Sequence, residues 1–258
     1  MICLATLNTW KCDGEYFERL EVINNEIRTL QPHIFLLQEA FQTSDNAIDT
    51  TQMIAEQLGY YYASTESRPK KRQLNNLYLD SYSNVSIVSK FPIINRYIIS
   101  LPTNAEDGGR EAIAAEIEID NKKVLAISIH LSHLRNGNEL RKQQLMHIFN
   151  QPFMRNEYAG VFIGGDFNCA MSEEFLRELE QPHYSIEDTY TYKKGMDGPD
   201  FTFSSQKISR KIDHILQYWL NSRNKAEIND SAIVFNEADP DYGIRASDHN
   251  GVMVKINI

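Results

Sequence analysis

The sequence predicts an α/β protein in which two packed sheets are flanked by helices. Short apolar strand patterns occur in both halves of the chain, and amphipathic helix patterns lie between them. No low-complexity linker, long-period repeat or abrupt shift in composition interrupts residues 1–258, so we expect a single domain. With 258 residues, of which 42% are hydrophobic, the chain can bury one large core or two small ones.

Strand and helix patterns alternate near the start of the chain. Residues 2–8 alternate as a strand, and the fully apolar segment 33–37 is typical of a strand buried on both faces. Residues 46–58 predict a helix that Gly59 closes. An earlier helix is expected over 15–31, with an apolar stripe formed by Phe17, Leu20, Ile23, Ile27 and Leu30.

Strand patterns dominate the rest of the chain. Asp120 and Asn121 predict a tight hairpin turn between two strands. Helices are expected at 138–150 and at 172–179, where Ser172 provides the N-cap. The expected strands are 60–64, 85–89, 97–101, 112–119, 124–130, 160–165, 201–204, 211–216, 231–235 and 251–257.

Cysteine usage and the absence of targeting patterns indicate a cytoplasmic protein. Cys3, Cys12 and Cys169 are odd in number and lack CxxC spacing, so they predict neither a disulfide framework nor a zinc site. The first residues lack a basic region and turn polar by Asn8, which indicates a strand and not a signal peptide. We expect no transmembrane segment and no obligate protein partner.

The net charge of −9 argues against a general nucleic-acid binder. This argument weakens if the acidic residues are concentrated at a metal site, because a bound cation reverses the local field. Nucleic acid therefore stays among the possible substrates.

Polar residues recur at the ends of apolar strands or within them. One such residue alone is better explained as an Asx-turn or as a hydrogen-bonded structural side chain. A whole set of them is harder to dismiss, because strands that run together collect their end residues at one rim of a rigid sheet. The set comprises Asn8, Gln38, Glu39, His130, Asp166, Asn168, Asp213, His214, Asp248 and His249.

The chemistry of this set favours a hard divalent cation and a phosphate ester. Carboxylates and an amide oxygen suit Mg²⁺, with Mn²⁺ as a substitute. The sequence contains no HExxH, GxSxG, Walker A or GxGxxG motif, so zinc, serine-nucleophile and nucleotide-cradle chemistries have no support. A cation, a base for water and imidazole donors together suit phosphate-ester hydrolysis, which depends on positioning and charge neutralisation.

Six short motifs occur in order along the chain: LNTW, LLQEA, SIHLSH, GGDFN, SRKIDHIL and SDHNGV. Together they resemble the signatures of the endonuclease/exonuclease/phosphatase superfamily, the deoxyribonuclease I-like proteins. The resemblance runs from Asn8 to His249. It implies a four-layered α-β-β-α sandwich, with two packed mixed sheets flanked by helices, and a metal-dependent hydrolase acting on phosphoester bonds.

The resemblance implies a role for each acid and amide of the set. Glu39 resembles the principal Mg²⁺ ligand, with Asn8 and Asp248 near the same site. Asp166 resembles the residue that orients or deprotonates the attacking water, and Asn168 a donor to a phosphate oxygen.

The resemblance also implies two catalytic histidines. His249 would pair with Asp213, and such a carboxylate fixes the tautomer of an imidazole and favours its charged form. His130 resembles the histidine that contacts the scissile phosphate, a position usually held by tyrosine in the AP-endonuclease branch. Members of the superfamily are interpreted differently on the identity of the base, so Asp166 and His249 both stay candidates.

Substrate contacts are predicted at three places. Arg110 precedes a strand, where some members of the superfamily place a phosphate-binding arginine. The segment ESRPKKR supplies Lys70, Lys71 and Arg72, unless it is a solvated surface loop. The segment YTYKKG supplies Tyr192 for stacking, unless its tyrosines belong to the core.

The leading hypothesis is a Mg²⁺-dependent phosphodiesterase or nuclease in which water attacks a phosphate in line. A phosphatase of inositol phosphates or other small phosphoesters is the main alternative, and a non-catalytic binding protein of the same fold is a minor one. A sphingomyelinase is disfavoured because the sequence shows neither an exposed apolar hairpin nor a basic amphipathic helix. In the leading hypothesis, Gly164 and Gly165 leave room for a phosphate that approaches the backbone.

Overall fold

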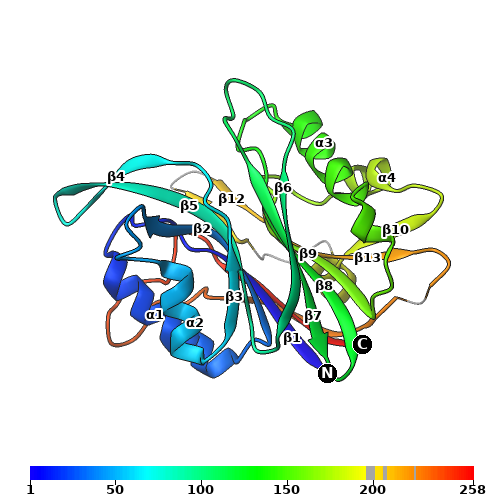
Figure 1. The fold of residues 1–258 in the computed structure, drawn as a ribbon, viewed down its shortest axis with the longest axis horizontal. Coiled ribbons are helices and arrows are strands. Elements are labelled where there is room, and N and C mark those ends of the chain that lie inside the picture. Colours follow the sequence, from blue (N-terminus) through cyan, green and yellow to red (C-terminus); the bar gives the residue numbers. More distant parts are fainter. Residues whose placement is uncertain (196–200, 206–207, 224) are drawn as a thin grey trace.

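The computed structural model describes residues 1–195, 201–205, 208–223 and 225–258, and it contains two large mixed sheets (Figure 1). The first sheet is built from β1 (Ile2–Asn8), β2 (Ile34–Thr43), β3 (Tyr61–Ser64), β4 (Lys70–Leu74), β5 (Leu77–Ser89), β14 (Glu227–Val234) and β15 (Gly251–Asn257). Its order is β14-β15-β1-β2-β5-β3, with β4 paired to β5.

The second sheet has the order β10-β13-β9-β8-β7-β6. Its strands are β6 (Ile93–Ser100), β7 (Glu111–Ile119), β8 (Lys122–His130), β9 (Gly160–Asp166), β10 (Tyr184–Asp188) and β13 (Asp213–Leu220). A separate short ribbon pairs β11 (Phe203–Ser205) with β12 (Ile208–Arg210).

Helices cover the outer faces of both sheets (Figure 1). Helices α1 (Tyr16–Leu30) and α2 (Thr50–Leu58) pack on the first sheet, and α3 (Asn138–Phe149) and α4 (Glu173–Leu179) pack on the second. The inner faces share one apolar cluster, to which Leu4 and Leu36 contribute from the first sheet and Val124 and Phe162 from the second. The predicted four-layered α-β-β-α sandwich is therefore confirmed. The remaining helical elements are the short η1 (Pro152–Arg155) and α5 (Thr189–Lys194).

One parallel strand pair in each sheet directs polar residues to a common place. Strands β1 and β2 run parallel and pair Asn8, at the carboxyl end of β1, with Gln38 in the middle of β2. Strands β8 and β9 also run parallel and pair His130 with Asp166 at their carboxyl ends. The two packed sheets thus bring three polar strand ends together, those of Asn8, His130 and Asp166.

Gly164 and Gly165 serve the packing of the sheets, so the expectation that they leave room for a phosphate is wrong. A Cβ on Gly164 would lie 2.7 Å from Leu36 Cδ1 of the facing sheet. A Cβ on Gly165 would lie 2.0 Å from the carbonyl oxygen of Ile129, and its φ of +147° also disfavours a side chain. Any larger residue at either position would force the surrounding strands apart.

Several predicted elements differ in extent from those observed. Strand β2 continues past residue 37 through a bulge, and β5 begins eight residues before the predicted 85–89 strand, at Leu77. Phe17, predicted on the buried stripe of α1, is 41% exposed. The turn at Asp120 and Asn121 is confirmed, because both residues have positive φ in a two-residue connection.

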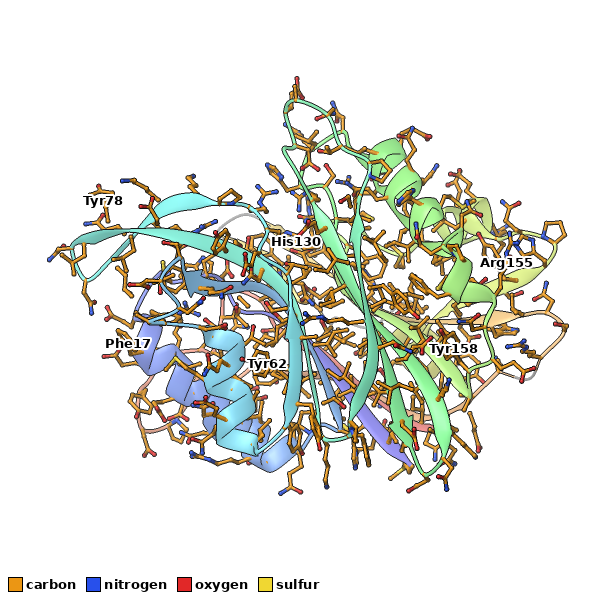
Figure 2. All side chains as sticks on the ribbon, in the orientation of Figure 1. Phe17, Tyr62, Tyr78, His130, Arg155 and Tyr158 are labelled. Carbon is orange, nitrogen blue, oxygen red and sulfur yellow. The ribbon has the colours of Figure 1, made fainter. Side chains whose placement is uncertain are left out.

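The basic residues Lys70, Lys71 and Arg72 lie in a strand and not in a loop, whereas Arg68 lies in the connection before that strand. Residues Lys70–Leu74 form β4, which pairs with β5 in a hairpin that extends away from the sandwich (Figure 1). Leu77 and Tyr78 near its tip are 64% and 71% exposed, so the expectation of no exposed apolar hairpin is also wrong. Tyr78 lies at the outer part of this hairpin, and His130 lies towards the body of the molecule (Figure 2). Within the described residues, no helix has the length and apolarity to cross a membrane.

A buried ion pair supports β13 from β10. Asp188 is 2% exposed, and its Oδ2 lies 3.2 Å from His214 Nδ1 and 3.6 Å from Lys211 Nζ. Burial alone would raise the pKa of Asp188, but His214 and Lys211 outweigh burial and hold that pKa below its usual range. His214 therefore belongs to this pair, on the face of β13 opposite to its neighbour Asp213.

We expect Asp188→Asn to lower the free energy of unfolding by about 3 kcal/mol at neutral pH, because it leaves His214 and Lys211 without their carboxylate. The folded pKa of Asp188 lies below the unfolded value. Its contribution is therefore present above the unfolded pKa and is lost as the pH falls from about 4 through the folded pKa. Urea unfolding at a series of pH values measures the difference, which should shrink towards about pH 3.

Asp80→Asn provides the matched control for this prediction. It removes the partner of Lys71 in a pair whose side chains are 66% and 69% exposed, so it should cost less than about 0.5 kcal/mol. If the loss in free energy of unfolding caused by Asp188→Asn stayed constant across the pH series, the stabilising role of the Asp188 carboxylate charge would be contradicted.

Candidate active site

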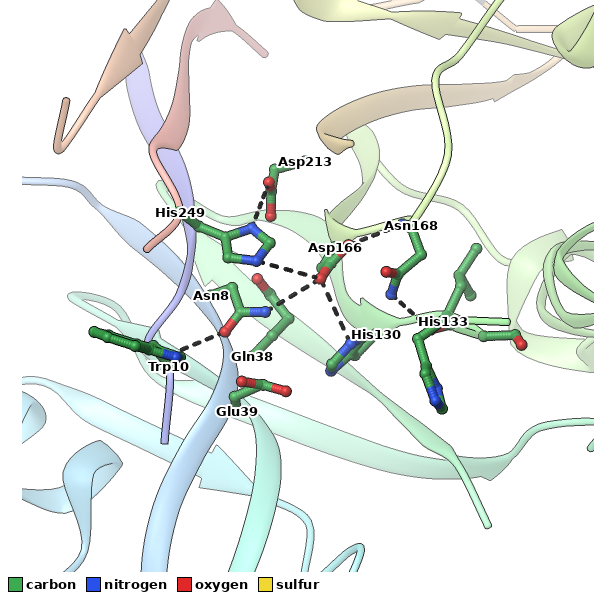
Figure 3. A network of polar contacts seen from close by, with 12 residues as sticks. Asn8, Trp10, Gln38, Glu39, His130, His133, Asp166, Asn168, Asp213 and His249 are labelled. Atoms are coloured by element: carbon green, nitrogen blue, oxygen red, sulfur yellow. Dashed lines mark hydrogen bonds and ion pairs between the residues drawn. The ribbon is translucent and has the colours of Figure 1, made fainter. Parts of the chain in front are cut away.

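Asp166 lies at the centre of the polar side chains gathered at the strand ends (Figure 3). It is 2% exposed, and its Oδ1 accepts a hydrogen bond from the Asn168 backbone N–H at 2.8 Å. Its Oδ2 accepts from Asn8 Nδ2 at 3.1 Å and lies 3.5 Å from His130 Nε2. Burial raises the pKa of Asp166 to about 7, and the charge of Asp213 adds to this rise. A carboxyl group with this pKa can take up a proton near neutral pH.

His249 and Asp213 form a buried dyad beside Asp166. His249 Nδ1 lies 2.8 Å from Asp213 Oδ2, and its Nε2 lies 3.9 Å from Asp166 Oδ2. Burial alone would lower the pKa of His249, but the carboxylates of Asp213, Asp166 and Asp248 outweigh it and raise that pKa to about 10. At neutral pH the imidazole is therefore charged and donates one N–H to Asp213. The Phe203 ring, 4.9 Å from the imidazole between centroids, covers one side.

His130 has the opposite character. Burial lowers its pKa well below the usual range, and the nearby charges of Arg110 and Arg68 act in the same direction. It therefore stays neutral where His249 is charged. Arg110 holds this strand end, since its Nη1 donates to the His130 carbonyl at 3.0 Å and its Nε to Asp107 Oδ2 at 2.7 Å.

Glu39 reaches the site from a bulge inside β2 and not from the end of the strand. The pairing of β2 with β5 shifts register between Leu37 and Ala40, and Glu39 takes a φ of +53°. A bulge changes the direction of a side chain, and positive φ is rare and costly for a residue such as glutamate. The Glu39 carboxylate is thereby presented at the cleft, where its Oε2 lies 2.8 Å from Lys11 Nζ.

The residues around Glu39 fit a hard divalent cation. Burial raises the pKa of Asp248; His249 opposes this rise, and the nearby charge of Glu39 adds to it. Two neighbouring carboxylates that repel each other are stabilised by a cation between them. Asn8 adds an amide oxygen, which already accepts from the Trp10 backbone N–H at 3.0 Å and keeps a second lone pair. Two carboxylates and an amide oxygen form a donor set that suits Mg²⁺.

A second group of potential ligands lies deeper. One atom each of Asp166, Asp213 and His249 fall within 4.8 Å of one another, all on buried residues. In this group, His249 Nδ1 and Asp213 Oδ2 are already joined by the 2.8 Å hydrogen bond of the dyad, whereas buried Asp213 Oδ1 has no hydrogen-bond partner among the described residues.

Arg19 of α1 forms hydrogen bonds with the loops that carry Asp248, His249 and the residues after Asn8. No sequence pattern predicted this role of Arg19. Arg19 is 3% exposed and lies 4.9 Å from the centroid of the Trp10 ring. Its guanidinium donates at 2.7–3.3 Å to backbone carbonyls on two loops, namely those of Thr9, Trp10, Lys11, Asp13 and Ala246. One buried cation thus joins the loop after β1 to the loop before His249.

Ser247 adds a second link between the same two loops. Its hydroxyl donates to the Asn8 carbonyl at 2.6 Å and accepts from the His249 backbone N–H at 3.1 Å. The positions of Asp248 and His249 relative to Asn8 are therefore set by buried hydrogen bonds on both sides of the loop.

The site opens into a cleft of about 1190 Å³. Of the residues predicted from sequence, the cleft is lined by Asn8, Glu39, Lys70, Lys71, Arg72, Arg110, His130, Asp166, Asn168, Asp248 and His249. Asp213 lies behind His249, fully buried. Asn168 Nδ2 donates to the Leu131 carbonyl at 3.0 Å, which leaves one of its two hydrogens free for a ligand.

Tyr192 lies elsewhere. It is 53% exposed on α5 and contacts Lys225, whose Nζ is 4.6 Å from the ring centroid, and it is not among the residues that line the cleft. Four residues in or near the cleft were not named from sequence as substrate or metal contacts, namely Lys11, Arg19, Arg68 and His133. Arg68 lies in the basic segment ESRPKKR and His133 ends the motif SIHLSH, whereas no local motif marks Lys11 or Arg19.

Comparisons with known proteins identify the family of the chain and its fold. The family model described as "Endonuclease/Exonuclease/phosphatase family" matches residues 5–249. A solved structure of TDP2 from D. rerio complexed with single strand DNA product has a TM-score of 0.76 at 16% identity, over 100% of this chain and 99% of that one.

Two bacterial structures are similarly close, each over 100% of both chains. An endonuclease/exonuclease/phosphatase family protein from Leptotrichia buccalis has a TM-score of 0.75 at 17% identity. A mannosyl-6-phosphatase from Bacteroides thetaiotaomicron has a TM-score of 0.73 at 18% identity. No curated protein matches this chain by sequence.

We expect Arg19→Met to lower the free energy of unfolding by about 3 kcal/mol or more, because several buried carbonyls lose a charged donor at once. Chemical denaturation monitored by circular dichroism measures the loss. Arg28→Met, on the exposed side of the same helix, is the matched control and should change stability by less than about 0.5 kcal/mol. Equal effects of the two substitutions would contradict the assignment.

Proposed function

The chain belongs to the endonuclease/exonuclease/phosphatase family, and we propose that it is a Mg²⁺-dependent phosphodiesterase with nucleic acid as its leading substrate. The observation that carries the proposal is the meeting of Asp166, His130 and the His249–Asp213 dyad around one point of an open cleft. A base, a neutral imidazole and a charged imidazole around one point are the parts that attack of water on a phosphate requires.

Glu39, Asp248 and Asn8 would hold the cation. When bound, Mg²⁺ neutralises charge on the phosphoryl oxygens and orients the ester, and Mn²⁺ has a similar preference for oxygen donors. Lys11 lies against Glu39, so this carboxylate keeps a positive partner on one side and offers its other oxygen to the cleft.

Asp166 is the better candidate for the base. Its raised pKa lets it accept the proton of an attacking water near neutral pH, and Asn8 and the Asn168 N–H fix its orientation. His249 would first have to lose a proton, because Asp213 keeps it charged. As a cation it is suited to stabilise the charge that develops on the phosphate, while neutral His130 donates a hydrogen bond from the opposite side.

The shape of the cleft supports a diester substrate. It extends from Asp166 along β4, past Arg72 to Asn76, so a chain could continue on either side of the reacting phosphate. A nucleic acid fits this openness, and the structurally similar TDP2 was solved with a single strand DNA product. The similar mannosyl-6-phosphatase makes small phosphomonoesters the alternative to be tested.

We expect Asp166→Asn and His249→Ala each to lower kcat at least about 100-fold while the fold is kept, because each removes a proton-transfer or charge-stabilising group. Hydrolysis of bis(p-nitrophenyl) phosphate and of single-stranded DNA with Mg²⁺ measures the loss. His147→Ala replaces an exposed histidine of α3 and should retain wild-type activity.

Two outcomes would contradict the proposal. Full activity of the His249→Ala variant would show that His249 has no catalytic role. Turnover of inositol or sugar phosphomonoesters without turnover of any diester would show that the substrate class is wrong.

We expect Glu39→Gln to weaken Mg²⁺ binding by at least tenfold, about 1.4 kcal/mol, because it removes one of the two carboxylates of the site. Isothermal titration of Mg²⁺ into the metal-free protein measures the affinity without reference to activity. Glu18→Gln, on an exposed position of α1, should leave it unchanged. Undiminished activity in EDTA would overturn the metal dependence.

A further inference from the structure

Side chains of both charge signs line the cleft. Its lining includes the acidic residues Asp13, Glu39, Asp166 and Asp248, and the basic residues Lys11, Arg68, Lys70, Lys71, Arg72 and Arg110. Of the acids, Glu39 and Asp248 belong to the proposed cation site, and Asp166 is the proposed base. Near His130, the part of the lining formed by Arg68, Arg110 and His133 contains two guanidinium groups and no acid.

The carboxylate nearest to this part of the lining is hidden behind it and already paired with Arg110. Asp107 is 2% exposed, does not line the cleft, and accepts a hydrogen bond from Arg110 Nε at 2.7 Å; its Oδ1 also lies 3.1 Å from His133 Nδ1. Arg110 is itself 4% exposed, and its Nη2 lies 2.6 Å from His133 Nδ1. A guanidinium can only donate, so His133 Nδ1 accepts from Arg110 and the ring hydrogen lies on Nε2, on a side chain that is 53% exposed.

Arg68 is a cation with spare donors. Its Nη1 donates to the Asp107 backbone carbonyl at 3.4 Å, and no other hydrogen bond of its side chain occurs among the described residues. Burial lowers the pKa of Arg68, and the charge of Arg110 acts in the same direction, yet a guanidinium stays protonated. Four of its five N–H groups are therefore without a hydrogen bond among the described residues.

The backbone is constrained to present Arg68 at this place. Its φ is +56°, which is costly for a residue with a side chain. The neighbouring Ser67 is buried and bonded through its N–H to Asn84 Oδ1 at 3.1 Å, and Arg72 Nη2 donates to the Arg68 carbonyl at 3.4 Å. Strain that the surroundings enforce in this way is characteristic of ligand-binding positions.

We propose that Arg68 and the free edge of His133, backed by buried Arg110, form a second anion subsite. It takes a phosphate group of the substrate adjacent to the phosphate that reacts beside His130. This inference rests on the proposed phosphodiesterase function and specifies its substrate as a compound with a second phosphate close to the scissile one. A single-phosphate diester would leave the subsite empty.

Matched pairs of chromogenic esters test the subsite. One pair is the 5′-(p-nitrophenyl phosphate) of thymidine with either a 3′-hydroxyl or a 3′-phosphate. The other is the 3′-(p-nitrophenyl phosphate) with either a 5′-hydroxyl or a 5′-phosphate. We expect wild-type kcat/KM to be at least about tenfold higher for the bisphosphate member of one pair, the worth of a charge-assisted hydrogen bond to phosphate.

Arg68→Gln should reduce this preference to about twofold or less, and Arg68→Lys should keep part of it, because lysine retains the charge but not the fork of donors. Arg96→Gln is the matched control, since Arg96 is exposed on β6 outside the cleft, and it should keep the wild-type preference. We expect the variants to fold, because the Arg68 side chain makes only one long hydrogen bond within the described residues. Thermal unfolding checks this.

Two results would overturn the subsite. In one, the wild type shows no preference for the bisphosphate member of either pair. In the other, Arg68→Gln lowers kcat/KM equally for both members of a pair. If no ester is hydrolysed, the proposed function fails, and equilibrium binding decides the subsite separately. Calorimetry in EDTA should then show that thymidine 3′,5′-bisphosphate binds the wild type more tightly than thymidine monophosphates do. That difference in affinity should be lost in Arg68→Gln. An unchanged difference in the variant would refute the assignment.

Discussion

The hydrogen bond between Asn8 Nδ2 and Asp166 Oδ2, 3.1 Å long, joins the two sheets at the point on which the site depends. It forms where β1 of the parallel pair β1–β2 and β9 of the parallel pair β8–β9 reach their carboxyl ends. Gly164 and Gly165 permit the approach, because a Cβ on either would collide with Leu36 or with the backbone of β8. The catalytic geometry is thus a result of how closely the two sheets pack.

Buried carboxylates that lie this close together need an opposite charge next to them. Asp166 and Asp213 are almost fully buried, and two such carboxylates repel each other unless a cation lies between them. His249 supplies that charge and is held cationic by them. Arg19 performs a related task for the loops, because its guanidinium satisfies carbonyls that would otherwise be buried without a donor.

The fold class and most strand positions could be predicted from sequence, because apolar periodicity is a local property. The strand-end residues could also be found, since motifs such as GGDFN and SDHNGV are contiguous. The bulge that presents Glu39, the strand β4 and the buried position of Arg19 could not, because each depends on partners that lie far away along the chain. The glycines were misjudged for the same reason: what crowds Gly164 is Leu36, more than a hundred residues earlier.

The contrast between the whole molecule and its cleft follows from this arrangement. A chain with a net charge of −9 repels a polyanion at long range, and screening by salt limits that repulsion to about 10 Å. Inside the cleft the nearest groups decide, and there Arg68, Arg72 and Lys70 line the surface while Asp107 is buried behind it. Net charge therefore predicts how fast a phosphate ester arrives better than it predicts whether the ester can bind. The buried hydrogen bond between Asp107 and Arg110, which orients this guanidinium, matters more for recognition than the sum of surface charges.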